Sequence, residues 1–520
     1  MNSNRPGDAG SDGNRFGRRS TVRAALMTTG SAYISYLAGL ISTAVLARTL
    51  GPATYGVYAY FVWLTGLLWA VYNSGFVSTS IRFISENIGR GLPGQSRAVM
   101  GWVVRRYLIW MAVATVGFVV AGPWLKPNAE AKISLLLLAM AVFGAMAKSG
   151  FTLLASFGKG YGRFEIESVT SSVLAVGNVV GVLVLAFYRA PLLGFAVFFL
   201  ALCVAHLLLA RPLAARAGIE ISRNGLNPEV AARLSLNWRW SALFALLATF
   251  SASSIEIYLL ERTVGAAAVA YFSLALAFAR AGVNLFIVGI SSTVLPVLSH
   301  AYGRAAGGGV AKVAPRALRY AHVLGMVIAG LGFFLAFPAI KLLYGGRYLA
   351  AVWILQAMVV AKAFTVGGGV LNALFVANDQ QRGRTKILAA ALVVNIGVAV
   401  ALVPKYGLSG AVFASVLSGI IDFAIMLAVA VRELELRLPV ASLLRLTMCG
   451  GFAAIPAYFL VFRGGSVVLH IGAAVAFCCT YVPLALVYGK WDEEDLALMR
   501  GFAGRFPRIL ALMERFGRRS

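Results

Sequence analysis

Five ionisable side chains lie deep within long apolar segments of this sequence, and their types point to the binding of an anion. They are three cations, Lys148, Arg280 and Lys362, and two acids, Glu256 and Asp422. A charge at the centre of a bilayer costs about 2.5 to 3.5 kcal/mol on insertion scales, so such residues usually face a cavity or a partner. Because Lys and Arg hold phosphate and pyrophosphate groups, we predict that the three cations line a substrate-binding cavity. The two acids would balance their charge or couple the site to an ion.

Small polar residues accompany these charges at helical spacing. Ser35 and Ser42 lie on one predicted helix, and Thr249 and Ser253 on another, and all four are candidates for the lining of the cavity. The alternative is that hydroxyl residues let helices pack closely. For the two lysines the alternatives are a structural salt bridge with Asp422 or Glu256, or a side chain that reaches for the membrane interface.

An internal repeat relates the two lysines to one another. Gly117, Phe118, Pro123 and Lys126 match Gly332, Phe333, Pro338 and Lys341 at an offset of 215 residues, and residues 48–51 match 262–265 at 214. Ordered matches at a constant offset indicate a duplication. Lys148 and Lys362 are 214 residues apart, and Asp422 matches His206 at 216. Each offset spans an even number of predicted helices, so the two copies form parallel lobes with a site between them.

The sequence lacks the residues that catalysis would need. It has no GxxxxGK[ST] nucleotide-binding motif, no His and Asp cluster for a metal, and no nucleophile placed beside a base. The predicted outer loops are short. We therefore expect no enzyme activity, no metal and no cofactor.

Long apolar runs must position these residues. The 520 residues are 60% hydrophobic and 12% charged, with a mean hydropathy of +0.82, which excludes a soluble protein. Runs of helical length predict an all-α polytopic membrane protein with about fourteen transmembrane helices. The predicted spans are 24–47, 55–77, 102–121, 133–157, 169–188, 192–210, 240–260, 268–296, 317–338, 349–377, 387–403, 408–431, 441–462 and 467–488.

The distribution of basic residues predicts the orientation in the membrane. The formal net charge is +27, but the cations are scattered between spans, which argues against nucleic acid as a partner. With the amino terminus and every second loop in the cytoplasm, 34 of the 46 Lys and Arg residues lie on that side and 9 on the other. The positive-inside rule then places both termini in the cytoplasm of a multi-pass protein of the inner (cytoplasmic) membrane.

These patterns divide the chain into six predicted segments. They are a basic cytoplasmic tail (1–23), an N-lobe of six spans (24–210), a cytoplasmic linker (211–239), a C-lobe of six spans (240–431), two further spans (441–489) and a cytoplasmic tail (490–520). The four cysteines lie in apolar spans without metal-ligand spacing.

Several short blocks resemble a known family. Residues 47–52 with Tyr55 to Tyr58, residues 295–299, residues 343–348, and Asn395 followed by residues 403–411 occur in the order found in polysaccharide flippases of the multidrug/oligosaccharidyl-lipid/polysaccharide exporter superfamily. The resemblance covers essentially the whole membrane region. It implies the two-lobed MATE-like fold of twelve helices, with two extra helices here.

The resemblance implies that the protein moves a polyprenyl-pyrophosphate-linked oligosaccharide from the cytoplasmic to the periplasmic leaflet for surface polysaccharide biosynthesis. The expected partners are this lipid-linked oligosaccharide and the bilayer, with other polysaccharide-assembly proteins as further candidates. Three alternatives stay open: a cation-coupled small-molecule or drug antiporter of the same superfamily, a flippase for a peptidoglycan lipid precursor, and a noncatalytic scaffold for envelope assembly.

Overall fold

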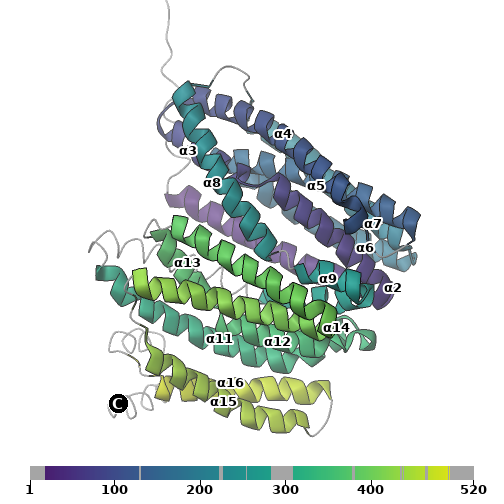
Figure 1. Ribbon diagram of the computed structural model, residues 1–520, viewed down its shortest axis with the longest axis vertical. Helices are drawn as coiled ribbons and strands as arrows, with labels where there is room; N and C mark the ends of the chain where they lie inside the picture. Colours follow the sequence, from purple (N-terminus) through teal and green to yellow (C-terminus); the bar gives the residue numbers. More distant parts are fainter. Residues whose placement is uncertain are drawn as a thin grey trace, which may run out of the picture. The chain divides into compact units, whose positions relative to one another are not determined.

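The chain folds into long α-helices. A computed structural model describes residues 18–127, 130–221, 226–252, 255–282, 308–377, 381–433, 436, 438–462, 466–489 and 491 (Figure 1). The helices of the first half are α2 (Arg18–Tyr72), α3 (Phe76–Gly89), α4 (Pro93–Leu125), α5 (Ala131–Gly160), α6 (Glu165–Phe187), α7 (Leu192–Arg216), α8 (Pro228–Ala252), α9 (Ile255–Thr263) and the apolar helix Ala266–Gly282. Those of the second half are α11 (Gly308–Leu343), the short 3-10 helix η1 (Gly346–Tyr348), α12 (Ala351–Phe364), α13 (Gly368–Ala377), α14 (Gln381–Glu433), α15 (Val440–Phe462) and α16 (Val467–Tyr488).

These helices have the length and composition of membrane spans. Within the described residues, nine helices are long and apolar enough to cross a membrane, or ten if the bent pair of α8 and α9 is one span. Every predicted span falls on a described helix, although the second half of the span predicted at 268–296 lies outside the described residues. The predicted all-α polytopic membrane protein is therefore confirmed. Of the predicted tails at 1–23 and 490–520, residues 1–17, 490 and 492–520 also lie outside the described residues.

Glycines separate spans that follow each other directly. Helices α2 and α14 each contain two predicted spans, and each is interrupted by one non-helical glycine, Gly51 (φ 72°, ψ 168°) or Gly407 (φ 56°, ψ −129°). Only glycine adopts such positive φ angles without steric cost. Gly265, which the repeat matches to Gly51, also has a positive φ of 113°. The same backbone feature thus recurs at repeat-related positions.

Three boundaries differ from the sequence-based prediction. The span predicted at 55–77 is broken before Gly75 (φ 74°), where α3 begins, and the span predicted at 349–377 is broken at residues 365–367, next to a run of three glycines. Helix α8 begins at Pro228, inside the predicted linker. There the Asn227 side chain accepts a hydrogen bond from the Glu229 backbone N–H at 3.1 Å, and proline suits the first helical position.

The chain forms two compact units, residues 1–270 and 271–520. In the first unit, α2 packs on α5 and α6, α5 packs on α7, and α8 packs on α3 and α2. In the second unit, α11 packs on α12, α14 packs on α12 and α13, and the hairpin of α15 and α16 packs on α11. The contacts thus group α8 and α9 with the first unit. The lobe boundaries drawn from the repeat remain a prediction.

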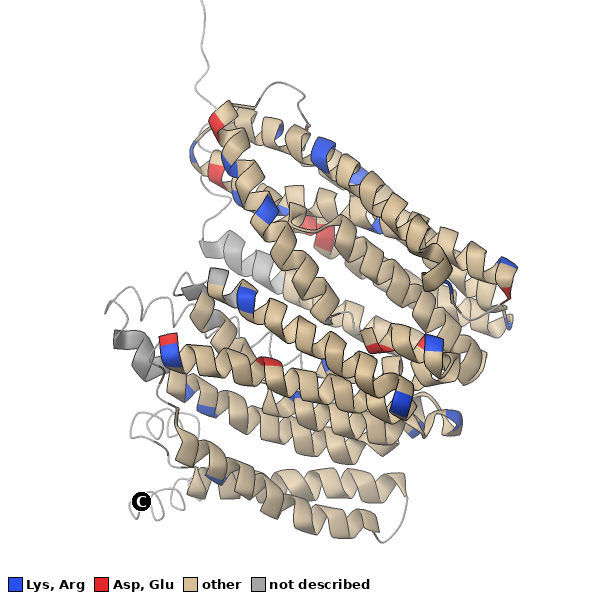
Figure 2. Ribbon diagram, in the orientation of Figure 1, with Lys and Arg blue, Asp and Glu red and all other residues tan. Residues whose placement is uncertain are grey.

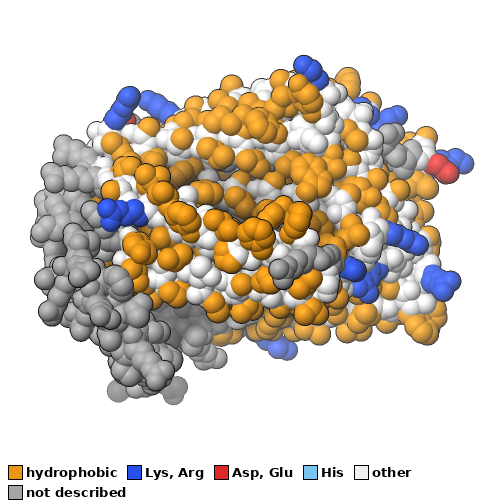
Figure 3. Space-filling view, turned by 90° about the horizontal axis from the view of Figure 1, so that it is seen from below, with side chains coloured by type: hydrophobic (Ala, Val, Ile, Leu, Met, Phe, Trp, Pro, Cys, Tyr) orange, Lys and Arg blue, Asp and Glu red, His pale blue; other side chains and the backbone are white. Residues whose placement is uncertain are grey.

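Polarity is distributed as a membrane environment requires. Large apolar side chains are exposed along the helices, for example Phe187, Phe462 and Val468, which are 82, 77 and 75% exposed. Hydrophobic side chains cover much of the face shown in Figure 3. Buried polar groups instead pair with each other: the Tyr107 hydroxyl donates to Ser149 Oγ at 2.7 Å, and Trp69 Nε1 donates to Thr152 Oγ1 at 3.0 Å. Apolar side chains thus form much of the outer surface, and interhelical hydrogen bonds pair polar groups in the interior.

The first prediction concerns the close approach at Gly56 in α2. A Cβ at this position would lie 1.8 Å from the backbone oxygen of Ala266, so Gly56→Ala should destabilise the protein by about 1 to 3 kcal/mol, as overpacking does. Gly66→Ala on the same helix has open space and should be neutral or slightly stabilising. Thermal unfolding of the purified protein in detergent measures both. Equal melting temperatures for the two variants would contradict this packing.

Candidate functional site

Lys148 lies near the middle of α5 with an aromatic and a histidine neighbour. Its Nζ atom is 5.3 Å from the ring centroid of Phe151, one turn later in the same helix, and the Phe151 ring is 5.0 Å from the ring of His206 in α7. Lys148 and His206 also interact electrostatically, and both are half-buried. No described carboxylate forms an ion pair with Lys148, and Glu167, the nearest acid in its field, is paired with Lys159.

Lys362 lies in the corresponding place in the second unit but has different neighbours. It is in the last turn of α12, which ends at Phe364, and its carbonyl accepts hydrogen bonds from the backbone N–H and the hydroxyl of Thr365. It interacts electrostatically with Asp422 of α14, the helix that packs on α12. Asp422 thus lies within the electrostatic field of Lys362, and the salt bridge that the sequence offered as an alternative to substrate binding stays a prediction.

Glu256 and Arg280 lie in different units. Glu256 is buried in the first turn of α9, where the helix amino terminus favours a negative charge. Arg280 is half-buried in the apolar helix Ala266–Gly282. Each has an interaction partner in the structure. Their assignment to the cavity remains a prediction.

The hydroxyl residues of the first span contribute to helix packing. Ser42 is buried and accepts a hydrogen bond from Asn178 Nδ2 of α6 at 3.0 Å. The hydroxyl of Ser31 donates to the backbone oxygen of Ser168, also in α6, at 3.0 Å. Ser35 and Thr249 are half-buried, and Ser253 lies outside the described residues. The contacts of Ser42 match the packing alternative, and the lining role of the four residues is still a prediction.

His206 is the residue of this region that the sequence-based site did not include. The signal was present, since the repeat matches His206 to Asp422. A histidine in an apolar span is no strong signal by itself, because only the packing of α5 on α7 brings His206 near Lys148.

An apolar pocket of about 510 Å³ lies in the second unit between α11, α12, α15 and α16. Its walls include Phe333, Phe364, Ile455 and Phe477, with hydroxyl groups from Thr447 and Tyr458. Val360 and Phe364 of the lining come from the same turns of α12 as Lys362. The pocket has the volume of a ligand site, roughly 300 to 1,000 Å³, and its chemistry suits a hydrocarbon chain.

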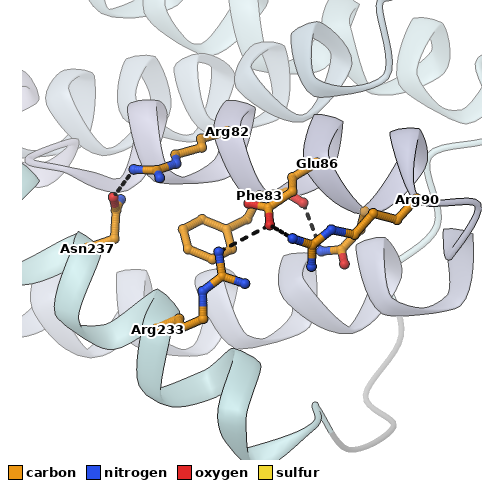
Figure 4. A network of polar contacts seen from close by, with 7 residues as sticks. Arg82, Phe83, Glu86, Arg90, Arg233 and Asn237 are labelled. Carbon is orange, nitrogen blue, oxygen red and sulfur yellow. Dashed lines mark hydrogen bonds and ion pairs between the residues drawn. The ribbon is translucent and has the colours of Figure 1, made fainter. Parts of the chain in front are cut away.

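A network of charged and polar contacts joins α3 to α8 in the first unit (Figure 4). Arg82 Nη1 donates to Asn237 Oδ1 at 2.8 Å, and Arg233 Nη2 lies 3.1 Å from Glu86 Oε1. Glu86 also pairs with Arg90, one turn later in α3, at 2.6 Å. Figure 2 shows few other charged residues along the middles of the described helices.

Shape complements charge at this contact. The guanidinium carbons of Arg82 and Arg233 each lie 5.8 Å from the ring centroid of Phe83. At the start of α3, a Cβ on Gly75 would lie 2.5 Å from the backbone nitrogen of Ala242, so the two helices nearly touch there. Helix α8 is thus held on α3 by close backbone packing at Gly75 and by ion pairs about three turns further along.

Known structures share this fold. A lipid II flippase MurJ in an inward closed conformation aligns with a TM-score of 0.71 and 14% identity, over 89% of this chain and 98% of that one. An inward-facing multidrug resistance MATE family transporter of the MOP superfamily aligns at 0.59 with 16% identity (77% and 95%), and a MOP superfamily transporter from Pyrococcus furiosus at 0.59 with 17% identity (80% and 95%). No curated relative matches the chain in sequence.

The fold is therefore the one that the lipid II flippase MurJ and the MATE family transporters share. The sequence profile of the polysaccharide biosynthesis protein family matches residues 21–302, more than half of the chain. The chain belongs to the polysaccharide biosynthesis protein family, which confirms the resemblance seen in the sequence.

The second prediction tests the Lys362 and Asp422 pair. Asp422→Asn removes the acid whose field reaches Lys362, so it should cost about 1 kcal/mol, below the 3 to 5 kcal/mol of a fully buried ion pair, because both residues are half-buried. Removing both charges with Asp422→Asn and Lys362→Met should recover much of that loss. Lys148→Met, which breaks no ion pair, should not destabilise. Thermal unfolding in detergent measures the stability of each of these variants and of the single Lys362→Met variant. If the effects of Asp422→Asn and Lys362→Met simply add in the double variant, the two residues do not interact.

The third prediction tests the network between α3 and α8. Arg233→Glu places two acids side by side and should cost about 0.5 to 1 kcal/mol, the range for exposed pairs. Adding Glu86→Arg should recover part of it, but not all, because Arg90 remains beside position 86. The matched control is Arg97→Glu, opposite Glu220 at 3.5 Å, where both side chains are at least half exposed and little change is expected. A double variant no more stable than the single one would remove the case for a direct pair.

Proposed function

We propose that this protein is a flippase that moves a polyprenyl-pyrophosphate-linked oligosaccharide from the cytoplasmic to the periplasmic leaflet by alternating access. The observation that carries the proposal is the match to the polysaccharide biosynthesis protein family, together with repeat-related lysines inside the spans. Charged groups in such positions are costly, so their retention calls for a use of the charge.

The cations fit the headgroup. Lys148 and Lys362, with Arg280, bind the pyrophosphate in this proposal, and Glu256 and Asp422 limit the positive charge of the empty site. Ammonium and guanidinium groups replace part of the hydration that a pyrophosphate loses on entering the membrane. The lysines occupy equivalent positions on the fourth span of each repeat, which is where a site between two lobes would draw on both copies.

The tail fits the apolar pocket. A prenyl chain is a hydrocarbon, and the pocket between α11, α12, α15 and α16 offers aromatic and aliphatic walls next to the helix of Lys362. The two helices without a repeat partner, α15 and α16, supply one side of it. In this proposal the tail occupies the pocket while the headgroup is held by the cations.

The excess of basic residues in alternate loops supports a cytoplasmic location for both termini and a place in the inner membrane. Other polysaccharide-assembly proteins are proposed partners because the substrate must be made and used by enzymes outside this chain.

A peptidoglycan lipid precursor is the second candidate substrate, because the structural likeness includes a lipid II flippase at a TM-score of 0.71. A cation-coupled antiporter is less well supported, since Asp422, one of its two candidate ion sites, faces the internal cation Lys362. A scaffold would not need the embedded charges at all.

The fourth prediction tests transport. Lys148→Ala and the double variant with Lys362→Ala should reduce flipping of a lipid-linked oligosaccharide by about tenfold or more, and Lys→Arg changes should retain part of it, because charge rather than shape is required. The assay uses purified protein in liposomes, with a fluorescent substrate whose outer copies are accessible to a quencher.

A fluorescent protein fused after Ser520, which matures only in the cytoplasm, reports both the membrane level of each variant and the predicted side of the carboxyl terminus. Lys132→Ala, an exposed lysine in the first turn of α5, is the matched control and should transport normally. Wild-type transport by the double Ala variant would refute the cation site. Transport of lipid II alone would favour the second candidate.

A further inference from the structure

Each unit places a lysine and a second titratable residue between two packed helices at repeat-related positions. In the first unit they are Lys148 of α5 and His206 of α7, and in the second unit Lys362 of α12 and Asp422 of α14. The offsets are 214 for the lysines and 216 for their partners. The fold therefore holds two versions of one arrangement, which differ in the residue that faces the lysine.

In the second unit the positive charge of Lys362 is compensated from within the protein. Asp422 of the neighbouring helix α14 lies within its electrostatic field, and the carboxyl end of α12, where the unpaired carbonyl groups favour a cation, lies two residues away. An incoming anion would have to compete with both of these for the ammonium group.

In the first unit Lys148 has neither kind of compensation. It lies far from both ends of α5, its ammonium is over the ring of Phe151, and the groups around it are that ring, the thiol of Cys203 and the imidazole of His206. Glu167, the acid whose field reaches Lys148, is paired with Lys159. This site keeps a net positive charge for a ligand to use.

The orientation of His206 makes it a second ligand. Its Nδ1 atom is 2.8 Å from the carbonyl oxygen of Leu202, which can only accept, so Nδ1 carries a hydrogen. The other ring nitrogen, Nε2, is then free to take up a proton and donate to a phosphoryl oxygen. The positive charge of Lys148 opposes a second positive charge on the imidazole of the empty site, so His206 takes up its proton together with the anion, whose negative charge offsets that repulsion.

We propose that Lys148 and His206 form the primary site for the pyrophosphate headgroup, and that Lys362 is occupied by Asp422 while the substrate is absent. The inference rests on the proposed function for the identity of the ligand. It assigns different roles to two lysines that the repeat makes formally equivalent, and it adds His206 to the residues that contact substrate.

The test exchanges the partner residues. His206→Asp gives the first unit the acid of the second, and it should weaken binding of inorganic pyrophosphate to the purified full-length protein by about tenfold or more, as well as flipping. His206→Gln keeps a side-chain donor and should retain part of the affinity. Asp422→Asn should raise the affinity, since it removes an acid whose field reaches Lys362. Calorimetry measures binding, and thermal unfolding confirms that each variant is folded.

The chain contains a matched control. His470 in α16 also bonds the carbonyl four residues earlier, Ser466 at 3.0 Å, and stacks on Phe337, which carries Lys341 on its ring at 5.2 Å. This Lys, Phe and His group lies at the end of α11 rather than in mid-span, so His470→Asp should not change pyrophosphate affinity.

The outcomes separate the inference from the function it rests on. Unchanged pyrophosphate affinity in His206→Asp, or equal losses in His206→Asp and His470→Asp, would overturn the proposed site even if the wild type flips its substrate. If the wild type binds pyrophosphate but flips no lipid-linked sugar, the proposed function is refuted. If pyrophosphate affinity is then lost in His206→Asp and not in His470→Asp, the anion site is still supported.

Discussion

Hydrocarbon cannot solvate a charge or an unpaired polar group, and the interior of this protein is arranged around that constraint. Interhelical hydrogen bonds such as Tyr107 to Ser149 and Asn178 to Ser42 satisfy the neutral groups. The charged groups that remain inside the spans are few, and the two lysines of the repeat meet the constraint differently. Lys362 has a carboxylate and a helix end, whereas Lys148 has an aromatic ring and an imidazole.

The two repeat-related lysines therefore lie in different electrostatic surroundings, although the fold is duplicated. Duplication produces two equivalent positions, and substitution of a single partner residue, His206 against Asp422, changes what each position can bind. An internally neutralised lysine stabilises the empty protein, and an uncompensated one is available to a ligand. A transporter that must bind an anionic headgroup and later release it can use both kinds of site, one in each unit.

The contact between α3 and α8 combines two kinds of interaction with different strengths. Gly75 lets the backbones approach where side chains would not fit, and this close packing depends on shape. Further along, Glu86 and Arg233 form an exposed ion pair worth at most about 1 kcal/mol, which salt screens and thermal motion can break. The apolar pocket beside α12 adds a third environment, suited to a chain without charge.

Hydropathy alone predicted the class of protein and nearly all of its spans, because burial in lipid depends on each residue's own polarity and on helix length. The repeat placed Lys148 and Lys362 at equivalent positions, since sequence offsets survive duplication. The sequence could not show that α8 starts at Pro228, that the tenth span breaks after Phe364, or that Ser42 accepts a hydrogen bond from Asn178. Those features depend on how each helix is rotated against its neighbours. Only the tertiary structure placed Asp422 in the field of Lys362 and His206 in the field of Lys148, because these side chains come from helices about sixty residues apart along the chain and their proximity follows from packing, not from composition.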